Sequence, residues 1–278
     1  MQSNKDILQA TLEDLFDKHQ MLPRIRKEFT GVQAFTEVIE ANGIDYDFAI
    51  DLLAHMAIHR RCKINVLVGI LRSHYNDTQR TADEICKCAE ADLVDFDPSI
   101  GLLVTVAQIG SELQDEIDKY QYPLPMVVPP EFIKTNTRNG YRIHNHGSVI
   151  LKDNHHTDDV CLDHINRANK TKLCINYEVM RMIQNKWKNL DKPKEDETVA
   201  DYQKRVKAFE KFDRTSRDVM KLILSEGNEF YLTHKVDKRG RTYCQAYQCN
   251  YQGTPWSKAT IEFFNKELLC NYSHQPNI

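Results

Sequence analysis

A proline-rich segment near the middle of the chain constrains the fold more than any other feature. Four of the eight residues from 123 to 130 are proline. Because proline lacks a backbone N–H group and clashes with the preceding helical turn, no helix can run through this segment. The chain has 278 residues, enough for one large domain or two ordinary ones, and the prolines separate a helical part from a mixed part.

The part before the prolines, residues 1–120, has the periodicity of a helical domain. Apolar side chains recur at helical spacing, as at Phe48 and Leu52. The segment Asp97-Pro98-Ser99 predicts the start of a further helix that runs to about residue 120. We therefore expect a compact, helical N-terminal domain.

The part after the prolines is mixed. Residues 121–158 form a proline-rich connection with a predicted β-hairpin, whose turn is Asn139-Gly140. A helical pattern returns over 159–228 as two long helices joined by the polar loop 191–201, which predicts a helical hairpin. Strand-like runs then follow within 229–278. The expected fold is mainly α with a small β portion.

Charge is distributed unevenly along the chain, although its sum is close to neutral. Lys and Arg total 37 and Asp and Glu total 40, a formal net charge of −3, which alone would argue against nucleic-acid binding. Residues 81–118 hold one basic and ten acidic side chains, whereas residues 160–241 hold 19 basic and 13 acidic ones. The first segment would repel a polyanion and the second would attract it.

Composition excludes several classes of protein. With 41% hydrophobic and 28% charged residues, the chain is typical of a globular protein and not of a disordered or collagen-like one. Its strongest apolar runs are too short to span a bilayer, and its N-terminus lacks the features of a signal peptide. Eight cysteines without framework spacing indicate free thiols in a reducing cytoplasm.

The sharpest functional signal is the segment Asp237-Lys238-Arg239-Gly240-Arg241, which lies between two strand-like runs. A glycine lets a phosphate backbone approach closely, and an arginine can bind phosphate through two N–H groups. Asp237 could hold one arginine so that the other stays available for a ligand. By itself, so short a pattern is more typical of a solvated basic hairpin.

Further motifs place this turn in a known context. The chain contains, in this order, VVPP at 127–130, the helical pair at about 160–226, D-x-x-G-R at 237–241, R-x-Y at 241–243 and N-x-Q-G at 250–253. In order and spacing, these motifs resemble the single-subunit DNA-directed RNA polymerases of the phage and mitochondrial type. The resemblance spans about residues 122–269. It implies a helical-hairpin thumb followed by the first β-hairpin strands of a polymerase palm.

The resemblance also implies nucleic-acid contacts at seven residues. The arginine that ends D-x-x-G-R would hold the template and the RNA–DNA hybrid near the active centre. The tyrosine of R-x-Y and the lysine after N-x-Q-G would face the hybrid, and an arginine of the second long helix falls near a family position that contacts nucleic acid. The residues concerned are Asp237, Arg239, Gly240, Arg241, Tyr243, Lys258 and Arg217. Among the neighbouring aromatic residues, we assign Tyr247 and Trp256 to packing.

The family's catalytic apparatus has no counterpart in these motifs. Its chemistry uses two aspartates that bind Mg²⁺ ions in later palm motifs, and only twenty residues follow Lys258. We therefore expect no catalytic residue and no metal ligand in this chain, with Asp237 as a structural partner of the cations beside it. Either the chain is a fragment of a longer enzyme, or it resembles the small subunit of the split, two-chain RNA polymerase of N4-like phages.

The second explanation is preferred, and it implies partners and a location. A larger chain would carry the fingers, the catalytic palm and the Mg²⁺ ions, and the isolated small chain would be inactive. The other partners would be the DNA template and the RNA–DNA hybrid, with phage accessory DNA-binding proteins as further candidates and no membrane. The expected location is the cytoplasm of an infected bacterial host.

Two other functions compete with this interpretation. The chain could be a stand-alone nucleic-acid-binding transcription accessory protein that uses the same basic hairpin. It could also be a metal-dependent nuclease, because several potential ligands cluster between residues 144 and 164. We interpret these as surface side chains, since zinc sites usually offer two clean ligand pairs and this segment offers one. The cluster consists of His144, His146, His155, His156, Cys161 and His164.

Overall fold

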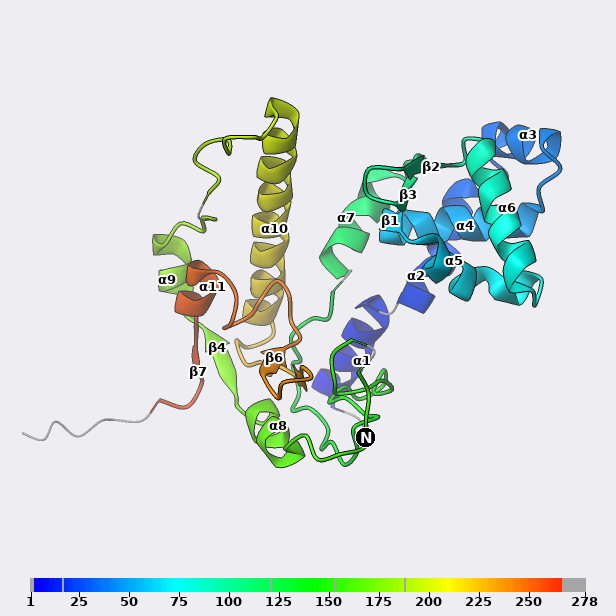
Figure 1. The fold of residues 1–278 in the computed structure, drawn as a ribbon. Helices are drawn as coiled ribbons and strands as arrows, with labels where there is room; N and C mark the ends of the chain where they lie inside the picture. Colours follow the sequence, from blue (N-terminus) through cyan, green and yellow to red (C-terminus); the bar gives the residue numbers. More distant parts are fainter. Residues whose placement is uncertain (1–2, 17, 121, 153, 188, 267–278) are drawn as a thin grey trace, which may run out of the picture. The chain divides into compact units, whose positions relative to one another are not determined.

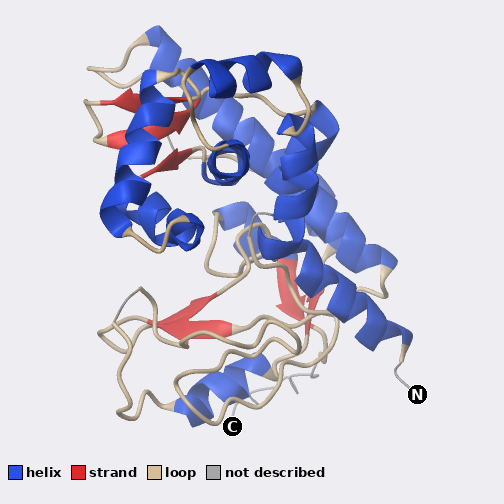
Figure 2. Ribbon diagram, turned by 90° about the vertical axis from the view of Figure 1, so that its right-hand side faces the viewer, coloured by secondary structure: helices blue, strands red, loops and turns tan. Residues whose placement is uncertain are grey.

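The computed structural model describes residues 3–16, 18–120, 122–152, 154–187 and 189–266 (Figure 1). The chain divides into two compact units, one of residues 14–121 and the other of residues 1–13 together with 122–278. Helices dominate, and the described strands form one three-stranded and two two-stranded sheets (Figure 2). The predicted fold class, mainly α with a small β portion, is confirmed. No helix in the described part of the chain has the length and apolar character needed to cross a membrane.

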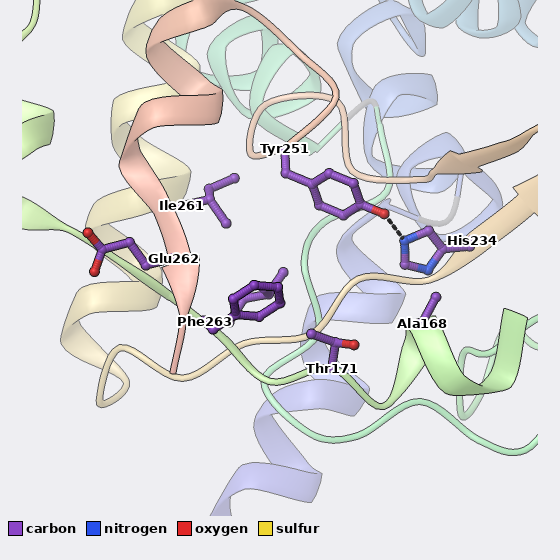
Figure 3. A pocket seen from close by; sticks show the side chains of 8 residues that line it. Ala168, Thr171, His234, Tyr251, Ile261, Glu262 and Phe263 are labelled. Atoms are coloured by element: carbon purple, nitrogen blue, oxygen red, sulfur yellow. Dashed lines mark hydrogen bonds between the residues drawn. The ribbon is translucent and has the colours of Figure 1, made fainter. Parts of the chain in front are cut away.

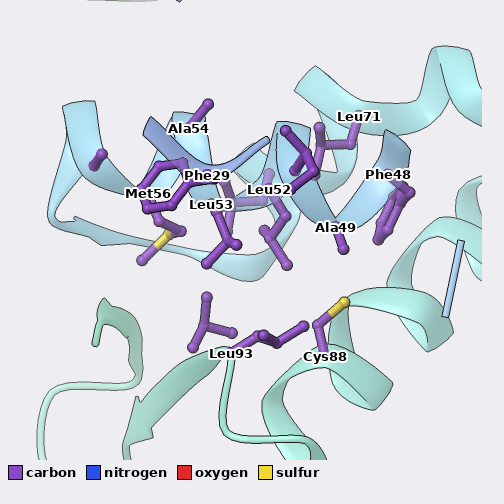
Figure 4. Packing of buried hydrophobic residues seen from close by; sticks show 14 of the residues in the cluster. Phe29, Phe48, Ala49, Leu52, Leu53, Ala54, Met56, Leu71, Cys88 and Leu93 are labelled. Carbon is purple, nitrogen blue, oxygen red and sulfur yellow. The ribbon is translucent and has the colours of Figure 1, made fainter. Parts of the chain in front are cut away.

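The unit of residues 14–121 is built around helix α4. Its helices are α2 (Lys18–Phe29), α3 (Gln33–Ala41), α4 (Tyr46–His59), α5 (Ile64–Leu71), the 3₁₀ helix η1 (Arg72–His74), α6 (Thr78–Glu90) and α7 (Ser111–Tyr120). α4 begins after Asp45, whose carboxylate accepts the N–H of Phe48 at 2.9 Å. Nine of its 14 residues are buried, so this helix forms the centre of the hydrophobic core (Figure 4).

A small antiparallel sheet completes this unit. β1 (Arg61–Cys62) and β2 (Val94–Asp97) both pair with β3 (Leu102–Thr105), which lies between them. The predicted helix from residue 97 to 120 is therefore wrong over its first half, and only α7 is helical there. Gly101 has a φ of +64°, a conformation that favours glycine, and it turns the chain back so that β3 can pair with β2.

In the other unit, the part of α1 (Asn4–Phe16) up to Glu13 organises the chain that follows the prolines. The buried Glu13 carboxylate accepts the backbone N–H groups of the three residues 142–144, at distances between 2.6 and 3.1 Å. Because these N–H groups bind a carboxylate, they cannot pair with a neighbouring strand. The β-hairpin predicted around Asn139-Gly140 is therefore wrong, and an isolated bridge between Arg138 and His146 stands in its place.

The predicted helical hairpin of residues 159–228 is wrong in its first helix. That stretch contains α8 (Leu162–Asn169), β4 (Leu173–Ile175) and α9 (Tyr177–Met182). β4 pairs with β7 (Ile261–Phe263), and the Asn228 side chain binds both the N–H and the carbonyl of Ile175, at 2.7 and 2.8 Å. These distant partners satisfy backbone groups that a continuous helix would have paired internally.

The second predicted helix is present as α10 (Val199–Ser225), which has 27 residues. It begins after Thr198, whose hydroxyl accepts the N–H of Asp201 at 3.1 Å. The remaining elements are β5 (His234–Val236), β6 (Thr242–Cys244) and α11 (Pro255–Thr260). β5 and β6 form an antiparallel hairpin around the D-x-x-G-R turn, which confirms the two strands predicted there.

Candidate nucleic-acid interface

The turn between β5 and β6 is organised around the Asp237 carboxylate. Its Oδ1 accepts the backbone N–H groups of Arg239 and Arg241 at 2.9 and 3.0 Å. Its Oδ2 accepts Nε–H of Arg241 at 2.8 Å and the hydroxyl of Tyr243 at 3.3 Å. Gly240 has a φ of +76° and donates its N–H to the Asp237 carbonyl at 2.9 Å. One carboxylate therefore holds the whole turn in a single shape.

The cations of the turn differ in how tightly they are held. Nη2 of Arg241 lies 2.7 Å from Asp237, whereas Nη2 of Arg239 lies 3.5 Å from the same oxygen. The side chains of Arg239 and Arg241 are 63% and 53% exposed, against 17% for Asp237. Arg241 is thus the arginine that Asp237 holds. Arg239 and the exposed Lys238 are the more available cations.

Opposing effects act on the carboxyl group of Asp237. Partial desolvation raises its pKa, but the hydrogen bonds and the positive charge of Arg241 outweigh this effect, so the pKa lies below its ordinary value. The same pairing raises the pKa of Arg241. The pair therefore stays charged at neutral pH, and the turn keeps its shape there.

The N-x-Q-G segment binds β6 along the edge that does not pair with β5. The Gln252 side-chain amide donates to the Thr242 carbonyl at 3.0 Å and accepts the N–H of Cys244 at 2.9 Å, as a neighbouring strand would. The Asn250 side chain in turn accepts the N–H of Gln252 at 2.6 Å. Asn250 and Gln252 thus support β6, and through it the basic turn.

His234 of β5 lies at the wall of a pocket of about 380 Å³ (Figure 3). Its Nδ1 lies 2.8 Å from Oδ1 of Asn169, and its Nε2 lies 2.7 Å from the Tyr251 hydroxyl. Because an amide oxygen can only accept, Nδ1 carries the proton. Burial lowers the pKa of His234, so the ring is neutral at pH 7 and its Nε2 accepts the hydroxyl of Tyr251. The apolar side chains of Ile261 and Phe263 line the same pocket.

The protonation of His234 is expected to make stability depend on pH. Burial, with a smaller effect of His164, lowers the pKa of His234 to about 4 from its ordinary 6.5. Between these two values the unfolded chain binds more protons than the folded chain, so the free energy of unfolding falls as the pH falls. We expect wild type to lose about 2 kcal/mol more than His234→Gln between about pH 7 and pH 4.

Urea unfolding of both proteins across this pH range measures the difference. Other titrating groups are common to the two chains, so their contributions cancel in the comparison. Parallel pH profiles would mean that the folded chain does not hold the His234 ring neutral.

Arg217 lies within a network that joins three segments. Its Nε–H donates to Asp213 at 3.0 Å, one turn earlier in α10, and its guanidinium carbon lies 5.0 Å from the ring centre of Trp256. Asp213 also accepts the side-chain amide of Asn185 at 2.9 Å. The structure thus places Arg217 between α10, α11 and the loop after α9, and its side chain is 33% exposed.

The other residues singled out by the sequence lie in and beside α11. Trp256 is 2% exposed, which confirms its predicted packing, and Tyr247, although 46% exposed, packs against two aromatic rings, as predicted. The Tyr247 ring lies at the surface against Tyr122 and Phe212, with ring centres 4.3 and 5.3 Å away. Lys258 is exposed in the last turn of α11.

A basic stripe on α10 was missed by the motif comparison. We define the α10 stripe as Lys204, Lys207, Lys211 and Arg214. Side chains three or four positions apart share one face of a helix. The buried residues Ser216, Met220 and Ile223 lie on the opposite face. Of the stripe itself, Lys204, Lys207 and Arg214 are exposed and Lys211 is half-buried. The spacing of its basic residues was the signal that could have found it.

The described residues do not fit the Mg²⁺ ions of a polymerase. Mg²⁺ takes several oxygen ligands in octahedral geometry, and no group of three or more His, Cys, Asp or Glu side chains in the described ranges could hold a metal ion. Both oxygens of Asp237 are taken by the turn. Within the histidine cluster, Cys161 donates to Asp163 at 3.2 Å, and His155 pairs with Ser148 at 2.8 Å.

Comparison with known proteins gives a distant relationship. No protein-family profile matches the chain. Among similar curated proteins, one from Gelasinospora sp. (strain G114) is 28% identical over 156 residues, which cover 52% of this chain and 17% of the relative. Another, from Agaricus bitorquis, is 26% identical over 174 residues, which cover 54% of this chain and 16% of the relative. Both are named "Probable DNA-directed RNA polymerase".

The chain is distantly homologous to DNA-directed RNA polymerases. The homology extends over about half of the chain, and the matched part spans about a sixth of the length of these relatives. It supports a polymerase-related role in transcription.

Proposed function

We propose that the chain is the small, non-catalytic subunit of a two-chain phage DNA-directed RNA polymerase. In this role it supplies the N-terminal domain, the thumb and the first palm strands, which hold the template and the RNA–DNA hybrid. A larger partner chain carries the aspartates that bind Mg²⁺. The observation that carries the proposal is the basic turn at 237–241, which Asp237 and Gln252 hold in one shape before any ligand arrives.

The α10 stripe supports the thumb role. The helix of 27 residues is about 40 Å long, and the stripe carries three exposed basic side chains and the half-buried Lys211. Lysine and arginine contacts to phosphates do not depend on base sequence. A polymerase needs such contacts, because it must hold the hybrid while it moves along any template. In this proposal α10 alone forms the thumb, without the second long helix.

β7 supports the proposed partner chain. One edge of this strand pairs with β4, and no described strand pairs with its other edge. Phe263 in β7 is 68% exposed, and Phe264 beside it is 39% exposed. Apolar side chains at an open strand edge favour the addition of another strand. In the proposed enzyme, a palm strand of the larger chain pairs here and covers the two rings.

The test of the proposal measures binding and synthesis separately. The purified chain is expected to bind a short RNA–DNA hybrid, with an affinity that falls steeply as salt rises. With a primed template, nucleotides and Mg²⁺, the same preparation is expected to incorporate no nucleotide. Coexpression with a chain that carries two palm aspartates is expected to give a complex that extends the primer.

Each part of this test can contradict the proposal. Template-directed synthesis by the isolated chain would refute the non-catalytic role. A chain that binds the hybrid but assembles with no palm-bearing partner would instead support a stand-alone accessory protein. If neither the free chain nor the complex binds the hybrid, the basic turn and the α10 stripe are not a nucleic-acid interface.

A further inference from the structure

Lys235 of β5 is a cation close to the turn that no motif singled out. It lies directly opposite Tyr243 in the register of the hairpin, and directly opposite residues share one face of a sheet. Its neighbours His234 and Val236 are buried on the other face, where β5 packs against α8. Lys235 therefore lies on the face that carries Tyr243 and the Asp237–Arg241 pair.

This lysine is half-buried, and none of the described residues supplies a counterion for it. Burial lowers the pKa of Lys235, and no carboxylate offsets the loss of water around the ammonium group. Asp237, two residues further on, already binds Arg241, Arg239 and Tyr243. Because charges removed from water are normally paired, the site is suited to an anion that comes from outside the chain.

We propose that Lys235 binds a phosphate group of the nucleic-acid backbone together with Arg241. The inference rests on the proposed function and adds a residue to its interface. Arg241 uses Nε and Nη2 to bind Asp237, so the N–H groups of Nη1 can bind a second anion. Phosphate oxygens accept from an ammonium and from a guanidinium at the same time. The ligand is a phosphodiester, which is bound whatever the base sequence.

The experiment uses the full chain and a fluorescein-labelled RNA–DNA hybrid. Anisotropy titrations over a range of salt concentrations compare wild type with Lys235→Gln, Lys235→Arg and the control Lys63→Gln, which changes an exposed lysine of the other unit. Lys235→Gln is expected to lower the slope of log affinity against log salt by about 0.9 and to weaken binding roughly threefold to tenfold. The arginine variant and the control should keep the slope of wild type.

A second measurement uses the wild-type chain, so it does not depend on a folded variant. Lysines are acetylated with an amine-reactive reagent in the free chain and in the complex, and the sites are quantified by mass spectrometry. The hybrid is expected to protect Lys235 and to leave Lys63 reactive.

The outcomes separate this inference from the proposed function. If wild type binds the hybrid, while Lys235→Gln keeps the full slope and Lys235 stays reactive in the complex, the lysine only packs its aliphatic stem and the inference is wrong. The proposed function would survive that result. If wild type does not bind the hybrid, both fail. Circular dichroism identifies a variant that has unfolded, and the labelling of wild type then decides.

Discussion

Replacement of the α10 stripe by glutamine is expected to weaken binding of an RNA–DNA hybrid by roughly a hundredfold to a thousandfold at physiological salt. Each phosphate contact releases about 0.9 of a counterion, so the loss of four contacts lowers the salt slope by about 3.6. At physiological salt this slope corresponds to two to three orders of magnitude in affinity, or about 3 to 4 kcal/mol. The α10 stripe is thus expected to contribute more affinity than any single residue of the turn.

The fold should tolerate this change. Lys204, Lys207 and Arg214 are exposed and Lys211 is half-buried, so none of the four belongs to the buried core, and glutamine has a helix propensity close to that of lysine and arginine. The ion pair of Lys204 with Asp201, at 3.4 Å, lies at the surface and contributes little. The thermal midpoint of the variant should therefore stay near that of wild type, so that a loss of binding reports on the interface.

A control variant with the same change in net charge distinguishes the phosphate contacts of the α10 stripe from the effect of the protein's net charge. It replaces four exposed cations that lie outside the proposed interface: Lys27, Lys63, Arg72 and Lys134. We expect this control to lose less than about tenfold in affinity, because none of these cations belongs to α10 or the 237–241 turn, and a cation that contacts no phosphate releases no counterion. Equal losses in the two variants would show that only net charge matters, and that α10 does not follow the hybrid.

The turn at 237–241 could be predicted from sequence because its determinants are local. A glycine at a left-handed position, an aspartate that accepts nearby N–H groups and flanking strand-like residues all lie within a few positions of one another. The second long helix was predictable for a similar reason, since 27 residues of regular periodicity leave little ambiguity. The elements that depend on residues close together in the sequence were therefore predicted correctly.

The prediction of the first helix of the hairpin was wrong because the residues that determine the structure there lie far away in the sequence. Residues 173–175 have the apolar character of a helix segment, but they pair with β7, almost ninety positions further along. The Asn228 side chain completes this arrangement from beyond α10. Lys235 could not be found from the sequence for a similar reason. The alternation of side chains along the strand predicts a surface residue, and only the folded hairpin shows that it is half-buried.

The near-neutral net charge was the least informative property of the sequence. The basic residues of α10 and of the turn belong to the unit formed by residues 1–13 and 122–278, whereas the acidic segment 81–118 belongs to the other unit. A sum over both units averages an acidic segment of one unit with a basic segment of the other. For a polyanion, the local arrangement of cations determines binding.

Trp256→Ala is expected to cost about 4 kcal/mol of the free energy of unfolding, the largest loss of stability that we expect from a single substitution. The Trp256 side chain is 2% exposed, and its indole N–H points at the carbonyl of Met180, 3.4 Å away. Removing the ring leaves a cavity between α9 and α11 and takes away the surface on which the Arg217 guanidinium rests. Urea unfolding followed by circular dichroism measures the loss.

The matched control is Trp187→Ala, which removes the chain's other tryptophan. Trp187 is 36% exposed and contacts Phe209 and Phe212 with ring centres 5.2 and 5.8 Å away, so about 1 to 2 kcal/mol is expected from its loss. Because the chain divides into two compact units, the circular dichroism curve can contain two transitions. Only the transition of the unit that contains Trp256 should move. If the two alanine variants cost the same, or if both transitions shift together, Trp256 is not the anchor that holds α11 against α9.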